Sequence, residues 1–263
     1  MQDGLPKVCI GVAVRNGEAI LPDVLDSLVR QSFPGFVVVV SDDASTDSSF
    51  EIARQFAARD RRIHCTRVDR GIGAAANRNR VFGFCQSPYF AWVDPGDLPA
   101  PGWLERCVGL LEADPGVVFA HTAQRQLGED GRPLTALAAR HPAEGTQTAD
   151  RIREVLRHMA GTAAGPGLMR SEALRQTGLI AGFAGGEAVL LTELALLGRF
   201  RQADEALCGR RGLGGPVARR LPPRVRLAAV KAVAASPLGP LQRLWCLGVA
   251  ARAMPAGGRR TGR

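Results

Sequence analysis

The sequence lacks the cysteine patterns that are typical of zinc sites and disulfide-rich folds. No two of its six cysteines have CxxC spacing, and several lie inside apolar segments, as buried free thiols do. They are Cys9, Cys65, Cys85, Cys107, Cys208 and Cys246. We therefore expect neither zinc nor a disulfide framework, which suits the reducing cytosol.

Long apolar runs are also missing. No uncharged apolar run approaches the ~20 residues that cross a bilayer, and the opening segment MQDGLPKV has no signal-peptide core. The four histidines show no mutual metal spacing, and no internal repeat of fixed period is present. These absences predict a cytoplasmic protein without a membrane-spanning helix.

Acidic residues are absent from the last part of the chain. No Asp or Glu follows Glu205, whereas 12 of the 34 Lys and Arg residues do, although the whole 263-residue chain has a net charge of +9. The part before this point is therefore mildly acidic. We expect a folded domain over residues 1–211 and a basic, Pro- and Arg-rich extension over residues 212–263.

Anionic membranes and nucleic acid are the two partner classes that suit such a basic extension. Between Arg224 and Arg252, apolar clusters alternate with single cations, as in segments that lie at a membrane surface. Trp245 is the only aromatic residue of the extension, so it offers few rings for base stacking. We expect an anionic membrane surface, at the inner face, rather than nucleic acid. A solvated, Arg-rich chain end explains the same composition.

Strands and helices are predicted to alternate through the first half of the chain. Residues with helical spacing separate apolar, largely β-branched runs. These runs predict strands at Val8–Val14, Phe36–Val40, Ile63–Val68, Tyr89–Val93 and Val117–Ala120. Such alternation predicts an α/β fold with a mostly parallel sheet and helices on both faces.

The pattern changes after the fifth predicted strand. We expect a polar loop region over Gln124–Gln147 and a Gly-rich connection over Gly161–Met169. A nearly all-apolar helix is expected from Glu187 to the Gly198 that ends it. Beyond Pro216 we expect only helical fragments.

Two of the predicted strands deliver acids to the same edge of the sheet. Asp42 and Asp43 follow the second strand, and Asp94 and Asp97 follow the fourth. Ligands of open α/β sheets bind at that edge. Crowded carboxylates need a cation or hydrogen-bond donors, and a divalent metal held by Asp94 and Asp97 and completed by a diphosphate would supply the charge. Helix capping and turn formation are the alternative use of such acids.

Glu187 follows two glycines, Gly185 and Gly186, and opens the apolar helix. A carboxylate at a helix start is stabilised by the helix dipole, which alone would explain the residue. An acid at the mouth of the same cleft is also a candidate general base. The residues by themselves leave both interpretations open.

Five sequence blocks follow one another between about Lys7 and about Arg211. They are VAVRNGE, FVVVVSDDASTDSS, GIGAAANRNRVF, PYFAWVDPGDL with PGWLERCVGLLEADP, and GLMRSEALRQTG with GEAVLLTELALLGRF. In this order they resemble the family 2 glycosyltransferases, which have the GT-A fold. The resemblance implies a nucleotide-binding half over residues 1–122 and an acceptor and catalytic half over residues 123–211. It also implies inverting transfer of a sugar from a nucleotide-diphosphate sugar to an acceptor hydroxyl.

The resemblance assigns roles to individual residues. Glu187 would be the catalytic base, and Asp94 and Asp97 would carry a divalent metal, Mn²⁺ or Mg²⁺. The nucleotide-sugar donor would contact Arg15, Asn16, Glu18, Asp42, Asp43, Arg78, Asn79 and Asp94.

The chain departs from the family pattern at four places. Gly96 stands where the metal motif usually has an acid, and the usual Pro and aromatic residue of the first turn are Ala13 and Arg15. The base, usually Asp, is Glu187, and the Arg-x-His often found downstream is absent. The alternative is therefore a metal-independent, weakened or inactive relative that binds a nucleotide or a partner enzyme.

Overall fold

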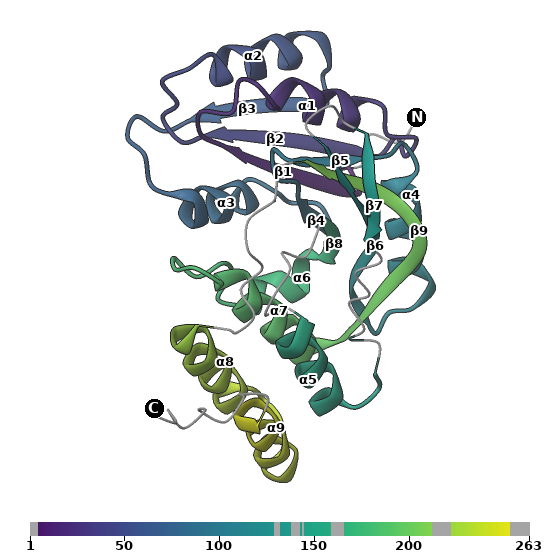
Figure 1. Ribbon diagram of the computed structural model, residues 1–263, viewed down its shortest axis with the longest axis vertical. Helices are drawn as coiled ribbons and strands as arrows, with labels where there is room; N and C mark the ends of the chain where they lie inside the picture. The colour runs from purple at the N-terminus through teal and green to yellow at the C-terminus, as the bar shows by residue number, and fades with distance from the viewer. Residues whose placement is uncertain are drawn as a thin grey trace, which may run out of the picture.

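Strands and helices alternate along the chain in the computed structural model, which describes residues 5–128, 132–137, 143, 145–158, 166–211 and 222–252 (Figure 1). The first half therefore has the predicted α/β order. The elements are β1 (Val8–Val14), α1 (Leu21–Val29), β2 (Phe36–Asp42), α2 (Ser49–Arg59), β3 (Ile63–Arg67), α3 (Ala74–Gly83), β4 (Tyr89–Trp92), β5 (Asp97–Pro99), α4 (Trp103–Ala113), β6 (Val117–Leu127), β7 (Pro133–Leu137), α5 (Thr148–His158), β8 (Gly167–Arg170), α6 (Ser171–Arg175), α7 (Gly186–Leu197), β9 (Arg199–Arg211), α8 (Pro223–Ala235) and α9 (Pro240–Arg252).

The strands within the described residues form one mixed sheet in the order β3-β2-β1-β4-β8-β6-β9-β5, with β7 paired to β6. The four strands β3, β2, β1 and β4 are parallel. Strand β8 is antiparallel to both neighbours, and β9 is parallel to β6 and antiparallel to β5. The predicted α/β fold is confirmed, with its parallel pairing concentrated in the first four strands.

Helices cover both faces of the sheet because alternate residues of the buried strands point in opposite directions. On one face, Val8, Ile10 and Val12 of β1 pack in a core with α1, α2 and α4. On the other face, Cys9 of β1 lies in a second core with α3, α6 and α7. Figure 1 shows α1 and α2 on one side of β1–β3 and α3 on the other.

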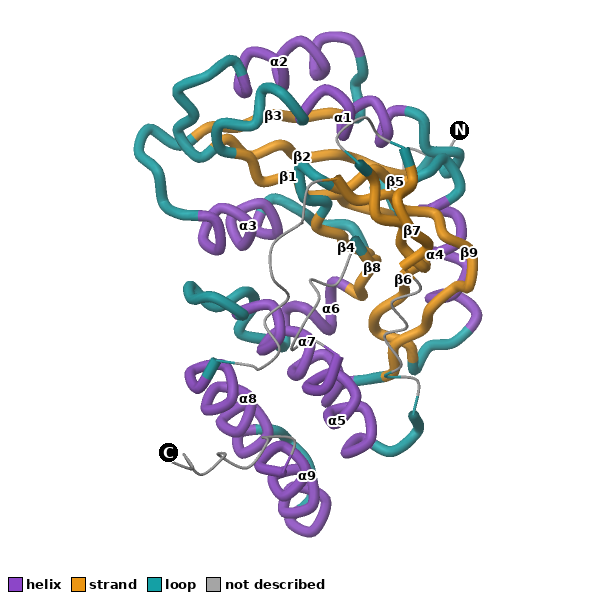
Figure 2. Tube along the Cα trace, viewed as in Figure 1, coloured by secondary structure: helices purple, strands orange, loops and turns teal. Residues whose placement is uncertain are grey.

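The two C-terminal helices pack on the helices of the second half and not on the sheet (Figure 2). Val225 of α8 contacts the cluster formed by Ala188 and Val189 of α7. Residues of α8 and α9 share a further core with Ile152 and Leu156 of α5. The part of the extension that the structure describes, residues 222–252, is therefore a helical pair joined to the body by apolar contacts.

Two expectations about the second half were wrong, and one strand was not predicted. Strand β6 runs through the predicted polar loop as far as Leu127 and pairs there with β7. Strand β8 lies in the predicted Gly-rich connection, where a Cβ on Gly167 would come within 2.2 Å of the Phe119 ring. Strand β9 had no strand signal that we recognised. All three strands are held by ladders to distant partners, which local periodicity does not reveal.

The expectation of free cysteines was also wrong for one pair. Cys9 of β1 and Cys85, just after α3, form a disulfide with their Cα atoms 5.9 Å apart. Helix α3 packs on β1 and so brings together two residues 76 positions apart. The described cysteines Cys65, Cys107, Cys208 and Cys246 are free. The cysteines therefore no longer argue for a reducing compartment. No described helix is both long and apolar enough to cross a membrane.

We predict that Trp103 anchors the core under α4 by its volume and not by a hydrogen bond. Its side chain is fully buried, and its indole nitrogen has no hydrogen-bond partner among the described residues. Trp103→Ala should lower the free energy of unfolding by about 3–5 kcal/mol. Trp103→Phe should cost clearly less, because most of the volume stays and no bond is lost. Denaturant unfolding of both variants measures this, and equal losses would contradict the prediction.

Candidate active site

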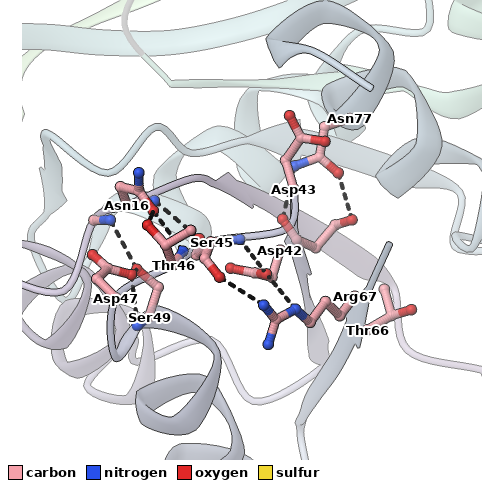
Figure 3. Close-up of polar contacts among 12 residues, drawn as sticks. Asn16, Asp42, Asp43, Ser45, Thr46, Asp47, Ser49, Thr66, Arg67 and Asn77 are labelled. Carbon is pink, nitrogen blue, oxygen red and sulfur yellow. Dashed lines mark hydrogen bonds and ion pairs between the residues drawn. The ribbon is translucent and has the colours of Figure 1, made fainter. Parts of the chain in front are cut away.

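Two loops at the carboxyl end of the sheet interlock through the side chains of Asn16 and Glu18. Asn16 has a backbone φ of 50°. Its backbone amide donates to Ser45 Oγ at 2.9 Å. Asn16 Oδ1 accepts from the backbone amide of Thr46 at 2.9 Å (Figure 3). Glu18 Oε2 accepts from the backbone amide of Ser48 at 2.9 Å. Two predicted donor-binding side chains thus fix the loop after β1 to the loop after β2.

Asp42 is fully buried at the end of β2. Its Oδ1 accepts from the amide of Ser45 at 3.0 Å and lies 3.3 Å from Arg67 Nε on the neighbouring strand β3 (Figure 3). The register pairs Asp42 with Arg67 directly, so the ion pair follows from the strand alignment. Asp42 therefore joins three consecutive features of this edge: β2, the loop that follows it, and β3.

Asp43 holds the segment that leads into α3. Its two carboxylate oxygens accept from the amides of Ile72, at 2.6 Å, and Gly73, at 3.0 Å. The side chain is 2% exposed, whereas Arg15, with Nη1 3.7 Å from Asp43 Oδ2, is 57% exposed. Of this pair, Arg15 is the side chain that an approaching ligand would meet.

Helix α3 is braced on both sides of Arg78. Asn77 donates to the carbonyl of Ser41 at 2.8 Å and accepts from the Ser41 hydroxyl at 2.6 Å, which ties the helix to β2. Asn79 donates to the carbonyl of Ile180 at 2.9 Å and accepts from the Ile180 amide at 3.1 Å. Asn79, which was predicted to contact the nucleotide-sugar donor, therefore holds the loop that precedes α7.

The start of α7 requires its two glycines. Gly185 has a φ of +87°, which an L side chain rarely adopts. At Gly186 a Cβ would come within 2.1 Å of the carbonyl oxygen of Ala181. This tight turn places Glu187 in the first turn of the helix.

Arg78 joins acids from two distant segments of the chain. Its Nη1 donates to Glu187 Oε1 in a short ion pair, and its Nη2 lies 3.6 Å from Asp94 Oδ1. The guanidinium carbon lies 5.9 Å from the centre of the Trp92 ring. Predicted residues from α3, the end of β4 and α7 thus meet at one cation.

A second cation, Arg210, lies at the same acids and was missed by the sequence analysis. Its Nη2 is 3.6 Å from Asp94 Oδ2, and its Nε is 3.6 Å from Asp97 Oδ1. Asp97 Oδ2 accepts from the Asp94 amide at 3.1 Å. Burial raises the pKa of the Asp97 carboxyl to about 7, and the Arg210 guanidinium opposes that shift. Because Arg210 belongs to β9, only the pairing of β9 with β5 reveals its position.

Four of these charged residues line one cavity of about 40 Å³, which has room for a few water-sized groups, and Arg210 lies just outside its lining. Its polar wall is formed by Arg78, Asp94, Asp97 and Glu187, and its apolar wall includes Trp92, Phe119, Met169, Ile180, Leu190 and Leu191. Apart from Asn79, which holds the loop before α7, the predicted residues therefore divide into two groups. Asp94, Asp97, Arg78 and Glu187 share the cavity, whereas the residues of the β1 and β2 loops form a separate corner.

The two predicted metal ligands do not by themselves make a metal site. No group of three or more His, Cys, Asp or Glu residues that could hold a metal occurs in the described part of the chain. A divalent cation takes six or more oxygen ligands, whereas here Asp94 and Asp97 each face Arg210, and Asp94 also faces Arg78. Both carboxylates are thus occupied by arginine, which counts against a divalent metal held by Asp94 and Asp97.

Sequence comparison places the chain among known glycosyltransferases. The family described as glycosyl transferase family 2 matches residues 9–178. TuaG of Bacillus subtilis, provisionally named a teichuronic acid biosynthesis glycosyltransferase, is 28% identical over 134 residues, which are 51% of this chain and 53% of TuaG. EpsE of the same organism, also provisionally named a glycosyltransferase, is 33% identical over 108 residues, or 41% of this chain and 39% of EpsE. The match thus spans about half or less of these relatives.

Solved structures share the fold. Residues 1–349 of Staphylococcus aureus TarS in complex with UDP-GlcNAc superpose with a TM-score of 0.73 at 17% identity, covering 94% of this chain and 72% of that one. The mannosyltransferase PcManGT of Pyrobaculum calidifontis, in complex with GDP-Man and Mn²⁺, gives a TM-score of 0.60 at 19% identity, covering 95% and 74%. The fold is therefore that of the GT-A glycosyltransferases.

We predict that Asp97 makes the stability of the protein depend on pH. An unfolded Asp titrates near pH ~3.9, and burial raises the pKa of Asp97 to about 7 in the folded state. The folded protein therefore binds more protons between these values. This contribution to stability is fully present below the lower pKa and is lost as the pH rises through the upper one.

Asp97→Asn should remove that contribution. The unfolding free energy of the variant minus that of the parent should rise as the pH increases from about 4 to about 8. Denaturant unfolding at several pH values measures the difference, and Asp26→Asn on the exposed side of α1 is the control. A difference that is flat across this range, or that falls, would contradict the assignment.

Proposed function

The chain belongs to glycosyl transferase family 2, and from this premise we propose that it transfers a sugar from a nucleotide-diphosphate sugar to an acceptor hydroxyl with inversion. The observation that carries the proposal is the cavity in which Arg78 pairs with both Glu187 and Asp94. An acid suited to deprotonate an acceptor and a cation suited to a phosphate lie side by side there. The proposal specifies the type of reaction and leaves the identity of the acceptor and of the nucleotide to experiment.

The donor is proposed to lie across the first half of the chain, residues 1–122, with the acceptor against residues 123–211. Asp42 and Asp43 would shape the nucleotide corner from within, because both are buried and bonded to loop amides. Arg15 would contact the base of the nucleotide from the solvent side, since its exposed, planar guanidinium can stack on an aromatic ring. Asn16 and Glu18 would act by holding the two loops together.

The chemistry would need one displacement. Glu187 takes the proton of the acceptor hydroxyl as that oxygen attacks the anomeric carbon. The bond between this carbon and the diphosphate oxygen breaks, and the nucleoside diphosphate leaves from the opposite face. Arg78, held between Glu187 and Asp94, is placed to stabilise the charge that develops on the leaving group.

A divalent ion is the other source of such charge, and PcManGT is described with Mn²⁺. In this chain Asp94 and Asp97 would have to hold the ion, with most ligands coming from the diphosphate and water. Their contacts with Arg78 and Arg210 count against this arrangement. No step above depends on a metal.

A family relative without catalytic activity is the second candidate. Asn16, Glu18, Asp43 and Asn79 form internal hydrogen bonds, which also suits a protein that only binds a nucleotide or a partner enzyme. Sugar transfer, or hydrolysis of a nucleotide sugar, by the pure protein would exclude this candidate. Binding without turnover across a panel of donors and acceptors would favour it.

The C-terminal helices are proposed to dock on an anionic lipid surface. Leu241, Leu244 and Trp245 of α9 lie at i, i+3 and i+4 and are 83%, 67% and 49% exposed. The opposite side of α9 packs in the core with α5 and α8. No acid follows Glu205, so α8 and α9 themselves carry cations and no carboxylates. The inner face of the cytoplasmic membrane, which is anionic, is the proposed location.

We predict that Glu187→Gln abolishes sugar transfer but preserves donor binding. Loss of the base should lower the transfer rate about 10²–10⁴-fold, whereas the corner at Arg15 and Asp43 is unchanged. Rates and donor affinity are measured across a panel of UDP- and GDP-sugars. The control is Glu193→Gln on the same helix, whose side chain accepts from the amide of Gly178 outside the cavity. A variant with the parental rate would overturn the role of Glu187.

We predict that Leu244→Glu weakens membrane binding at least about tenfold, because an apolar contact is lost and a like charge is added. Flotation with phosphatidylserine-containing vesicles measures this, compared with pure phosphatidylcholine. Leu134→Glu on β7 is the control, because Leu134 is similarly exposed at 60%. No flotation of the parent protein, or an equal effect of both variants, would refute lipid docking. Self-association lost only in Leu244→Glu would instead indicate a second copy as the partner.

A further inference from the structure

We propose that Arg210, together with Arg78, supplies the positive charge for the diphosphate of the donor, so that the enzyme works without a divalent ion. This inference rests on the proposed sugar transfer and specifies how its leaving group is stabilised. It assigns a role to Arg210, for which the sequence alone predicted none. Three features of the site support it.

The first feature is the packing of Gly96, where a side chain would be crowded by β9. The amide of Arg211 donates to the carbonyl of Gly96 at 2.8 Å, so β9 runs directly against this turn. A Cβ on Gly96 would lie 3.1 Å from the Arg211 carbonyl oxygen, closer than nearly all such contacts. An acid at this position would require β9 to move by a few tenths of an ångström. The close approach of β9 therefore favours glycine here.

The second feature is the register that delivers Arg210 to the acids. Asp97 and Arg210 are direct partners in the antiparallel pair of β5 and β9. The guanidinium consequently lies 3.6 Å from Asp94 and 3.6 Å from Asp97 while only 16% of the side chain is exposed. A divalent ion shared by these carboxylates would have to displace a cation that the sheet holds there.

The third feature is a set of unused hydrogen-bond donors. Arg210 Nε and Nη1 and Arg78 Nε are buried and have no hydrogen-bond partner within the described residues. Arginine presents five N–H donors in a planar fork that matches phosphate oxygens. Buried donors without partners are costly. An entering diphosphate would satisfy Arg210 Nη1 and Arg78 Nε, whereas Arg210 Nε faces Asp97 Oδ1 at 3.6 Å.

The test compares nucleotide binding with and without metal. UDP and GDP are titrated into the full-length protein by calorimetry, first in excess EDTA and then in excess Mn²⁺. We expect one of them to bind in EDTA with an affinity within about threefold of that in Mn²⁺. Arg210→Gln should weaken this binding at least about tenfold. Binding that requires Mn²⁺, or no binding of either nucleotide in either condition, would overturn the inference.

Two further variants separate charge from folding. Arg210→Lys keeps the charge but loses the planar fork of donors. Its affinity for the nucleotide in EDTA should lie between that of the parent and that of Arg210→Gln. Arg211→Gln is the matched control, because Arg211 is the next residue of β9 and its side chain pairs with Asp23 of α1, not with the cavity. Equal losses in the Arg210→Gln and Arg211→Gln variants would reduce Arg210 to a structural role.

Turnover distinguishes this inference from the proposed function. If sugar transfer in EDTA equals that in Mn²⁺ and Arg210→Gln lowers kcat more than it changes KM, both stand. If transfer occurs only with a divalent ion, the function stands and the inference fails. If a nucleotide binds without metal and depends on Arg210, but no sugar is transferred to any acceptor, the role of Arg210 stands and the catalytic proposal fails.

Discussion

The ion pair between Arg78 and Glu187 is the contact on which the arrangement of the cavity depends. It joins α3, which follows the nucleotide corner, to α7, which begins 103 residues after the last residue of α3. Both side chains are largely buried, at 19% and 29% exposed, so removal of either partner would leave a poorly solvated charge. This pair is therefore the direct contact between the cation of α3 and the proposed base of α7.

Around this pair, most polar side chains form hydrogen bonds that fix the backbone, so they are not free to bind a ligand directly. Asp43 holds the entry to α3, Asn79 holds the loop before α7, and Asn77 ties α3 to β2. Each makes two bonds to neighbouring groups, so each position is fixed in direction as well as distance. Rigid support of this kind limits the reorganisation needed when charge develops, which is the main source of electrostatic catalysis.

The sequence predicted elements that have a strong local pattern of buried residues. It did not predict elements that depend on pairing with residues far away in the chain. Strand β1 has the predicted bounds, and the helix that opens at Glu187 is confirmed, because buried parallel strands and two consecutive glycines have strong local signals. The strand β9, by contrast, is polar along much of its length and is fixed by β6 and β5. Arg210 and the Cys9–Cys85 pair were missed for the same reason, since their partners lie far away in the chain.

The departures from the family pattern are therefore linked and not independent. Strand β9 lies against the turn after β4 and crowds any side chain at position 96, and the same approach brings Arg210 to Asp94 and Asp97. With cations already at the acids, Arg78 is free to pair with Glu187 as well as Asp94, and the longer side chain of Glu187 spans the distance to it. The crowding at Gly96 and the position of Arg210 thus share one cause, the run of β9 beside β5 and the turn after β4. A random loss of function would more simply have removed the acids and left no cation in their place.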